Sequence, residues 1–234
     1  MNCTLCPAFE QSVFRDLGSL ELATLERHKK ERFIERGAEL FGTSDSAQSF
    51  YCNRSSFFKI GQRAPSGEQE VIVRLAPPGD CLGHRSVFHR RTYLGRAQAL
   101  QEGVVCELPR SALQDLLATS PSLARRLLEK LSQEISDCEE RLQLGHQHSV
   151  RQRLASLFLR LGRSIGETAE GPEAVTLRLP LTRRDLAALI PTSMETVVRE
   201  LSQLKREAAL VEESEQTFRL SMSKLHDILA TEKT

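Results

Sequence analysis

The sequence predicts an α+β fold in which a jelly-roll β-barrel is followed by a long helix and a small helical domain. Three observations support this order. Short apolar runs alternate with turn residues between about residues 37 and 108, one apolar stripe at helical spacing follows, and two short amphipathic segments meet near residue 191. We therefore expect a barrel with its leader at 1–110, a long helix at 111–145 and a C-terminal domain at 146–234.

The strands of the predicted barrel follow a leader with two cysteines and a predicted small helix over residues 18–34. The apolar runs at 50–52, 57–60 and 71–75 are separated by turn clusters such as residues 77–80. Several short strands without long helices between them are typical of an antiparallel barrel or sandwich.

A helical region begins after the barrel. Residues 111–118 predict a short helix, and Ser120 and Pro121 suit the cap and first position of a long one. We expect this helix to end at Gly145. Its apolar residues recur every three, four or seven positions, which favours a two-stranded helical seam; packing of the stripe against its own barrel is the alternative. The expected dimerisation residues are Leu127, Leu131, Ile135, Cys138 and Leu142.

Residues 181–201 have the layout of a helix-turn-helix, with two capped helices around a tight break. Glu195 and Arg199 lie four residues apart on the outer face of the second helix. The start of such a helix enters the major groove, where Arg can bind guanine and Glu can bind cytosine. Alone, the pair suggests only an intrahelical salt bridge; in this frame, base reading is the better interpretation. The expected DNA-contacting residues are Thr182, Arg183, Thr192, Ser193, Met194, Glu195, Val198 and Arg199.

These pieces together resemble the Crp/Fnr family of transcription regulators. The matching motifs are Pro-Gly-Asp at 78–80, Ala-Gln-Ala-Leu at 97–100, Val-Cys-Glu-Leu-Pro at 105–109 and Glu-Thr-Val-x-Arg at 195–199. The resemblance implies a cyclic-nucleotide-binding-like barrel, a dimerisation helix and a winged helix with its wing at 210–212 and 217–220. It also implies a homodimer on double-stranded DNA with TTGA-like or TGTGA-like half-sites, and RNA polymerase as a partner if the protein activates transcription.

Two residues depart from the family pattern. Val198 stands where relatives often have Ser or Gly, which limits the expected base reading to the inner bases of the half-site. Pro191 stands where a glycine commonly makes the turn. Because proline cannot take a positive φ, the turn must differ locally.

The cysteines place the resemblance closest to the oxygen- and redox-sensing Fnr-like branch. Its members hold an iron–sulfur cluster by three N-terminal cysteines and one in the barrel domain. Cys3, Cys6 and Cys106 match three of these positions, whereas Ser12 stands at the other. A 4Fe–4S cluster normally takes four thiolates, so the fourth would be Cys52, another side chain or an exogenous ligand. A reversible disulfide between Cys3 or Cys6 and Cys106 is the rival interpretation, and no sensing role is the third.

We expect the remaining cysteines to be incidental, namely Cys52, Cys81 and Cys138. A cyclic nucleotide is not expected, because His84 replaces the glutamate that binds the ribose in nucleotide-binding members and Ala97 follows Arg96. We expect His84 to lie in a solvated basic loop instead.

The composition is ordinary for a globular chain. It is 40% hydrophobic and 27% charged with a net charge of +1, so overall charge does not indicate a nucleic-acid partner. No run of about 18 apolar residues predicts a membrane span, and no secretory signal is evident. No nucleophile–base set or phosphate-binding glycine loop occurs. We expect a cytoplasmic protein with reduced thiols that is not an enzyme.

Overall fold

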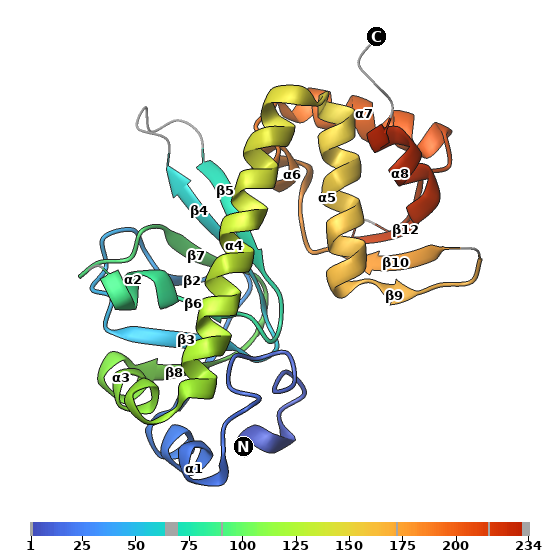
Figure 1. The fold of residues 1–234 in the computed structure, drawn as a ribbon. Coiled ribbons are helices and arrows are strands. Elements are labelled where there is room, and N and C mark those ends of the chain that lie inside the picture. The colour runs from blue at the N-terminus through green and yellow to red at the C-terminus, as the bar shows by residue number, and fades with distance from the viewer. Residues whose placement is uncertain (1, 64–69, 90, 172, 215, 231–234) are drawn as a thin grey trace. The chain divides into compact units, whose positions relative to one another are not determined.

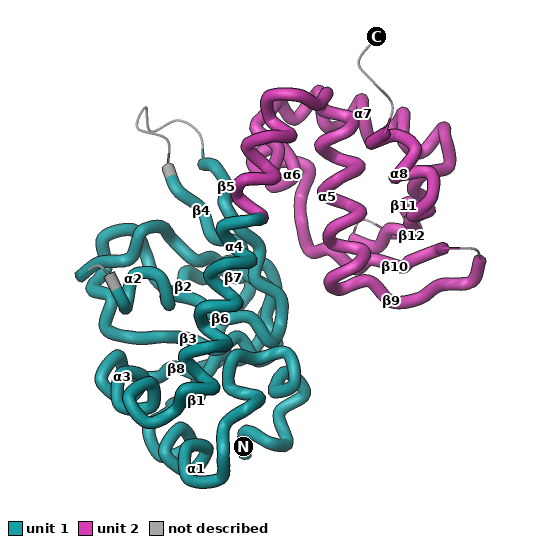
Figure 2. The backbone as a smooth tube through the Cα atoms, viewed as in Figure 1, with its two compact units in different colours: residues 1–136 teal, residues 137–234 magenta. Residues whose placement is uncertain are grey.

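The structure is a computed structural model that describes residues 2–63, 70–89, 91–171, 173–214 and 216–230 (Figure 1). The chain divides into two compact units, residues 1–136 and 137–234 (Figure 2), and each is described by itself. The division falls within helix α4 (Pro121–Gln147). This helix continues past Gly145, so the predicted end there is wrong. A glycine costs a helix only about 1 kcal/mol relative to alanine, and here α5 begins after the N-cap Ser149.

Two antiparallel sheets form the barrel of the first unit. One has the order β1-β8-β3-β6 and the other β2-β7-β4-β5. The first contains β1 (Lys30–Ile34), β8 (Gly103–Pro109), β3 (Ser49–Asn53) and β6 (Cys81–Leu82). The second contains β2 (Glu39–Phe41), β7 (Arg96–Gln101), β4 (Phe57–Arg63) and β5 (Glu70–Ala76). The predicted run of short strands is therefore present.

The helix predicted over residues 18–34 is shorter than expected. Helix α1 is Ser19–His28, and β1 follows directly after Lys29. Strand β1 pairs with β8 from Lys30 opposite Glu107 to Ile34 opposite Gly103. Pairing with a distant strand therefore overrides the local helical pattern in this segment.

Alternation along the strands gives the first sheet two different faces. Tyr51 of β3 and Val105 of β8 belong to the core inside the barrel. Phe50 and Leu108 belong instead to a second core with the leader, α1 and α3 (Arg110–Thr119), where Cys52 also packs. Residues of β3 and β8 with even numbers therefore face the leader and the helices.

Helix α4 uses its apolar stripe in two ways. Leu123 and Leu127 are buried in the second core, which corrects the prediction of Leu127 as a dimerisation residue. Leu128, Ile135 and Leu142 are about 60% exposed at intervals of seven residues. Cys138 is also exposed, while Leu131 is half-buried. The barrel thus covers one side of the stripe, and a second apolar row remains uncovered.

The second unit is a helical domain with a small sheet. Helix α5 (Val150–Ile165) packs with α7 (Met194–Arg206) and α8 (Met222–Ala230), and α6 (Arg183–Leu189) packs with α7. The sheet has the order β11-β12-β10-β9. Its strands are β9 (Glu167–Thr168), β10 (Ala174–Arg178), β11 (Leu210–Ser214) and β12 (Thr217–Ser221). The segments predicted as a wing lie in the β11–β12 hairpin. In the described part of the chain, no helix is both long and apolar enough to cross a membrane.

Candidate DNA-reading helix and thiol pocket

Both helices of the predicted helix-turn-helix begin at the predicted caps. Thr182 Oγ1 accepts a hydrogen bond from Asp185 N (3.1 Å), and Asp185 Oδ2 accepts one from Thr182 N (3.0 Å), which forms a capping box before α6. Ser193 Oγ accepts from Thr196 N (3.2 Å) before α7. Because caps satisfy N–H groups that have no partner within the helix, they fix where each helix starts.

The turn between α6 and α7 accommodates Pro191 without a left-handed residue. Thr192 N donates to Ala187 O across the turn (3.3 Å). Among the described non-glycine residues, positive φ occurs only at Ser44, Glu173 and Ala208, all outside this turn. The local difference expected at Pro191 is therefore a turn with only negative φ values.

The start of α7 presents a free outer face. Val197 is fully buried, whereas Met194, Glu195, Val198 and Arg199 are exposed. The Arg199 side chain is 70% exposed and its Nη2 lies 3.2 Å from Glu200 Oε1. Within the described residues no ion pair joins Glu195 to Arg199. Both side chains are thus available to an external ligand, and their contact with DNA remains a prediction.

Arg183 is held within the unit rather than left free. Its guanidinium forms an ion pair with Glu212 of β11 and lies 5.6 Å from the centre of the Phe218 ring. Lys205 of α7 pairs with the same carboxylate. Burial alone would raise the pKa of Glu212, but Lys205 and Arg183 outweigh it and lower this pKa. This network connects both helices to the wing, and the structure thus places Arg183 in a supporting position.

Four cysteines line one small cavity in the first unit. Cys3 and Cys6 come from the leader, Cys106 from β8 and Cys52 from β3, and the cavity measures about 40 Å³. The structure thus brings together the three predicted redox residues. It adds Cys52, which was expected to be incidental. The sequence places Cys52 in a strand but does not give the register that aligns it with Cys106.

The charges around this thiol pocket, defined by Cys3, Cys6, Cys52 and Cys106, are arranged around Lys29. Its Nζ donates to Cys3 Sγ at 3.1 Å. Burial alone would lower the pKa of Lys29, but this hydrogen bond and the nearby thiols outweigh it and raise this pKa. Burial raises the pKa of Cys106, and raises that of Cys52 further. The ammonium group therefore contacts Cys3 directly, while burial keeps Cys52 and Cys106 protonated.

An iron–sulfur cluster fits this pocket in the number and kind of its ligands. All four cysteines are free thiols, as a cluster with four thiolate ligands requires. Among the described residues, no three His, Cys, Asp or Glu side chains are arranged to hold a metal ion. The four thiols are thus gathered at one cavity, but the described residues form no site for a single metal ion.

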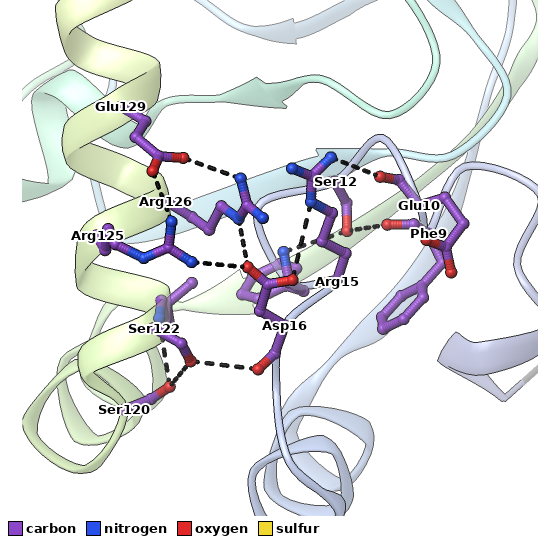
Figure 3. A network of polar contacts seen from close by, with 12 residues as sticks. Phe9, Glu10, Ser12, Arg15, Asp16, Ser120, Ser122, Arg125, Arg126 and Glu129 are labelled. Atoms are coloured by element: carbon purple, nitrogen blue, oxygen red, sulfur yellow. Dashed lines mark hydrogen bonds and ion pairs between the residues drawn. The ribbon is translucent and has the colours of Figure 1, made fainter.

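The leader that carries Cys3 and Cys6 is attached to α4 by ion pairs (Figure 3). Asp16 Oδ2 accepts from Arg126 Nε at 2.5 Å and from Arg125 Nη2 at 3.2 Å. Both arginines also pair with Glu129. Ser12, at the position of the missing cysteine, donates to Phe9 O (2.8 Å) within a leader turn. A movement of the leader would therefore act on the first turns of α4.

His84 corrects another expectation, because it is buried rather than solvated. Only 1% of the residue is exposed, since it lies between strand β6 and helix α4. Its Nδ1 is 3.4 Å from Cys81 Sγ and its Nε2 is 3.2 Å from Glu134 Oε2. Burial disfavours its charge, yet Cys81 and Glu134 raise the pKa of His84 to about 9. His84 therefore links the sheet to α4 as a cation.

Glu134 is the anionic partner in this network. Burial alone would raise the pKa of Glu134, but His84, Arg74 and Lys130 outweigh it and lower this pKa to about 2. Arg74 Nη1 lies 3.1 Å from Glu134 Oε1 and 2.6 Å from Asp80 Oδ2. Since each buried charge faces an opposite one, the network can remain ionised.

The barrel interior contains stacked aromatic rings. The rings of Phe41 and Tyr93 are 3.9 Å apart at their centres, and Phe41 also stacks with Tyr51. Arg96, the arginine nearest to a phosphate-binding motif, pairs with Glu70 at 2.6 Å. Its guanidinium is thus engaged by a carboxylate of the barrel itself.

Comparison with known proteins places both units in described families. Residues 31–120 match the Cyclic nucleotide-binding domain, and residues 152–228 match the Crp-like helix-turn-helix domain. The chain is 27% identical over 235 residues to the Anaerobic regulatory protein of Pasteurella multocida, covering 100% of this chain and 85% of that protein. It is 26% identical over 212 residues to the Fumarate and nitrate reduction regulatory protein of Vibrio cholerae serotype O1, covering 90% of this chain and 83% of that protein.

A solved structure shows the same fold. FixK2 from Bradyrhizobium japonicum matches with a TM-score of 0.76 at 22% identity, covering 88% of this chain and 99% of that one. The predicted fold class is thereby confirmed: a β-barrel domain, a long helix and a C-terminal helix-turn-helix domain.

Proposed function

The chain belongs to the Crp/Fnr family of DNA-binding transcription regulators rather than to an enzyme family, and on this premise we propose that it is a dimeric regulator controlled by redox state at the thiol pocket. The observation that carries the proposal is the gathering of Cys3, Cys6, Cys52 and Cys106 around one cavity. Relatives named for anaerobic regulation support the same class of signal.

We further propose how the DNA is read. Two copies pair along the exposed row of α4, and each inserts the start of α7 into one half of a palindrome with TTGA-like or TGTGA-like half-sites. Arg199 binds guanine and Glu195 binds cytosine. The two recognition helices must lie about 34 Å apart, one turn of DNA, so a change in the α4 seam changes the affinity. RNA polymerase is a further partner if the protein is an activator.

An iron–sulfur cluster is the proposed occupant of the pocket. Cys3, Cys6 and Cys106 would hold it, and when bound it would supply sensitivity to oxygen. The apolar walls from Phe9, Phe14, Leu25 and Leu108 limit access of water. The leader passes a change at Cys3 and Cys6 to α4 through Asp16.

A dithiol switch is the second candidate, because the same cavity brings Cys3 and Cys6 of the leader together with Cys106. In that case hydrogen peroxide oxidises Cys3 or Cys6 together with Cys106; two thiols and one peroxide give one disulfide and two waters.

The test is the affinity of the purified chain for a palindromic duplex, measured by fluorescence anisotropy. Three samples are compared: anaerobic protein, the same protein after exposure to air or peroxide, and the exposed protein after it has been reduced again. We expect the dissociation constant to change with treatment, and equal values would remove the redox proposal. Iron analysis and visible absorption then distinguish the cluster from the disulfide, which mass spectrometry detects directly.

A further inference from the structure

The position of Cys52 follows from the strand register rather than from sequence proximity. On β3 and β8, Cys52 is the direct cross-strand partner of Cys106. Directly opposed residues of an antiparallel pair have Cβ atoms about 4.5–5.5 Å apart on the same face. The two thiols therefore lie beside each other on the face that the leader covers, and Cys52 is only half-buried there.

Ser12 is a poor source of the fourth ligand. Its hydroxyl donates to Phe9 O and accepts from Phe14 N at 3.2 Å, and these two bonds hold it within the leader turn. A neutral hydroxyl is also a much weaker iron ligand than a thiolate. The leader thus supplies two thiols and not a third.

The two remaining cysteines lie outside the pocket. Cys81 is the other cross-strand partner of Cys52, but it is 1% exposed and contacts His84 instead of lining the cavity. Cys138 is exposed on α4, in the second unit. Glu31 is the one carboxylate among the residues that line the cavity, and it is paired with Arg54 at 2.9 Å. Cys52 is the one further thiol among the residues that line the cavity.

We propose that Cys52 is the fourth thiolate ligand of the iron–sulfur cluster, so that the sheet supplies two ligands and the leader supplies two. This inference rests on the proposed function, because it concerns the same pocket. Each thiol releases its proton when it binds iron. The positive charge of Lys29, whose Nζ lies 3.1 Å from Cys3 Sγ, offsets part of the negative charge of four thiolates.

The experiment is anaerobic reconstitution of the full chain with ferrous iron and sulfide. Wild type is compared with Cys52→Ser, Cys52→Ala and two matched controls, Cys81→Ser in the same sheet and Cys138→Ser on α4. Iron and sulfide per chain and visible absorption are the readouts. Losing even a supporting contact costs a metal site about 10- to 100-fold in affinity. We therefore expect both Cys52 variants to lose at least about tenfold in iron affinity, while the controls retain the wild-type value.

A second measurement needs no substitution. Loaded wild type is alkylated with iodoacetamide before and after removal of iron by a chelator, and the modified peptides are mapped. We expect both Cys52 and Cys106 to be protected from alkylation while iron is bound, and both to become reactive once the chelator has removed it. A Cys52 that reacts equally in both states, or folded Cys52 variants that load fully, overturns the inference and leaves the cluster intact. A wild type that binds no iron or sulfide overturns the cluster proposal and, with it, the role of Cys52.

Discussion

Asp16 of the leader lies 2.5 Å from Nε of Arg126 on α4, so the segment that carries Cys3 and Cys6 is joined to the helix of the proposed dimer seam. Arg126 and Arg125 lower the pKa of Asp16 chiefly through the hydrogen bond from Arg126, which keeps the carboxylate charged. The ion pair is thus a connection through which a change at the thiols can reach α4.

Removing this connection tests the coupling. Asp16→Asn abolishes the charge but keeps the size of the side chain, and we expect the ratio of oxidised to reduced DNA affinities to fall several-fold toward one. Glu129→Gln is the matched control, because Glu129 pairs with the same two arginines without touching the leader. A full redox response in Asp16→Asn would show that the signal takes another route.

The second prediction concerns base reading by Arg199. A bidentate contact to guanine is worth about 1–3 kcal/mol, so Arg199→Ala should weaken binding to the specific palindrome by roughly 5- to 150-fold. Arg199→Lys should recover little, since lysine lacks the planar pair of donors. Anisotropy with specific and unrelated duplexes measures both effects.

Arg206→Ala provides the control for Arg199, because it removes the same charge from the last turn of α7. We expect it to weaken specific and unrelated DNA equally, through loss of charge alone. If both variants behave in the same way, Arg199 contributes charge and does not read a base.

Local patterns were sufficient to predict much of the second unit. Thr182 and Ser193 cap α6 and α7 as expected, because a cap depends on residues only three positions away. The inner-face residues Leu186, Val197 and Leu201 are buried for the same reason, since helical spacing alone places them.

Features that depend on distant partners were not predictable in this way. Residues 30–34 become a strand because β8 lies beside them, and His84 is buried because Glu134 and Cys81 satisfy it. The same holds for the thiol pocket. The spacing of Cys3 and Cys6 is a local pattern, but the alignment of Cys52 with Cys106 requires the strand register.

The third prediction concerns the exposed row on α4, formed by Leu128, Ile135 and Leu142. Ile135→Glu places a charge at its centre, and we expect the dissociation constant of the dimer to rise by at least about tenfold, equivalent to 1.4 kcal/mol. Sedimentation measures the assembly state. Gln133→Glu adds the same charge on roughly the opposite side of the helix and should leave the dimer unchanged. A stable Ile135→Glu dimer would place the seam elsewhere.

The last prediction follows from the buried pair of His84 and Glu134. Below about pH 6.5, the ordinary pKa of histidine, His84 is charged in both folded and unfolded chains and the pair stabilises the fold in full. As the pH rises toward about 9, the unfolded chain loses this proton first, so the stabilisation declines and is lost above the folded pKa. Glu134 acts in the other direction: its stabilisation is lost only as the pH falls from about 4.5 toward about 2.

Urea unfolding of wild type and His84→Gln between about pH 5.5 and pH 9.5 isolates the histidine, because Glu134 stays charged throughout that range. We expect the difference in unfolding free energy to shrink by on the order of 3 kcal/mol from the acidic to the alkaline end. The exposed His28, whose Nδ1 is 2.9 Å from Thr24 O, supplies the control variant His28→Gln, which makes the same substitution outside the buried network. A histidine NMR titration gives the pKa of His84 directly; a midpoint at or below 6.5 would mean that the buried ring is neutral and that the link to α4 is not ionic.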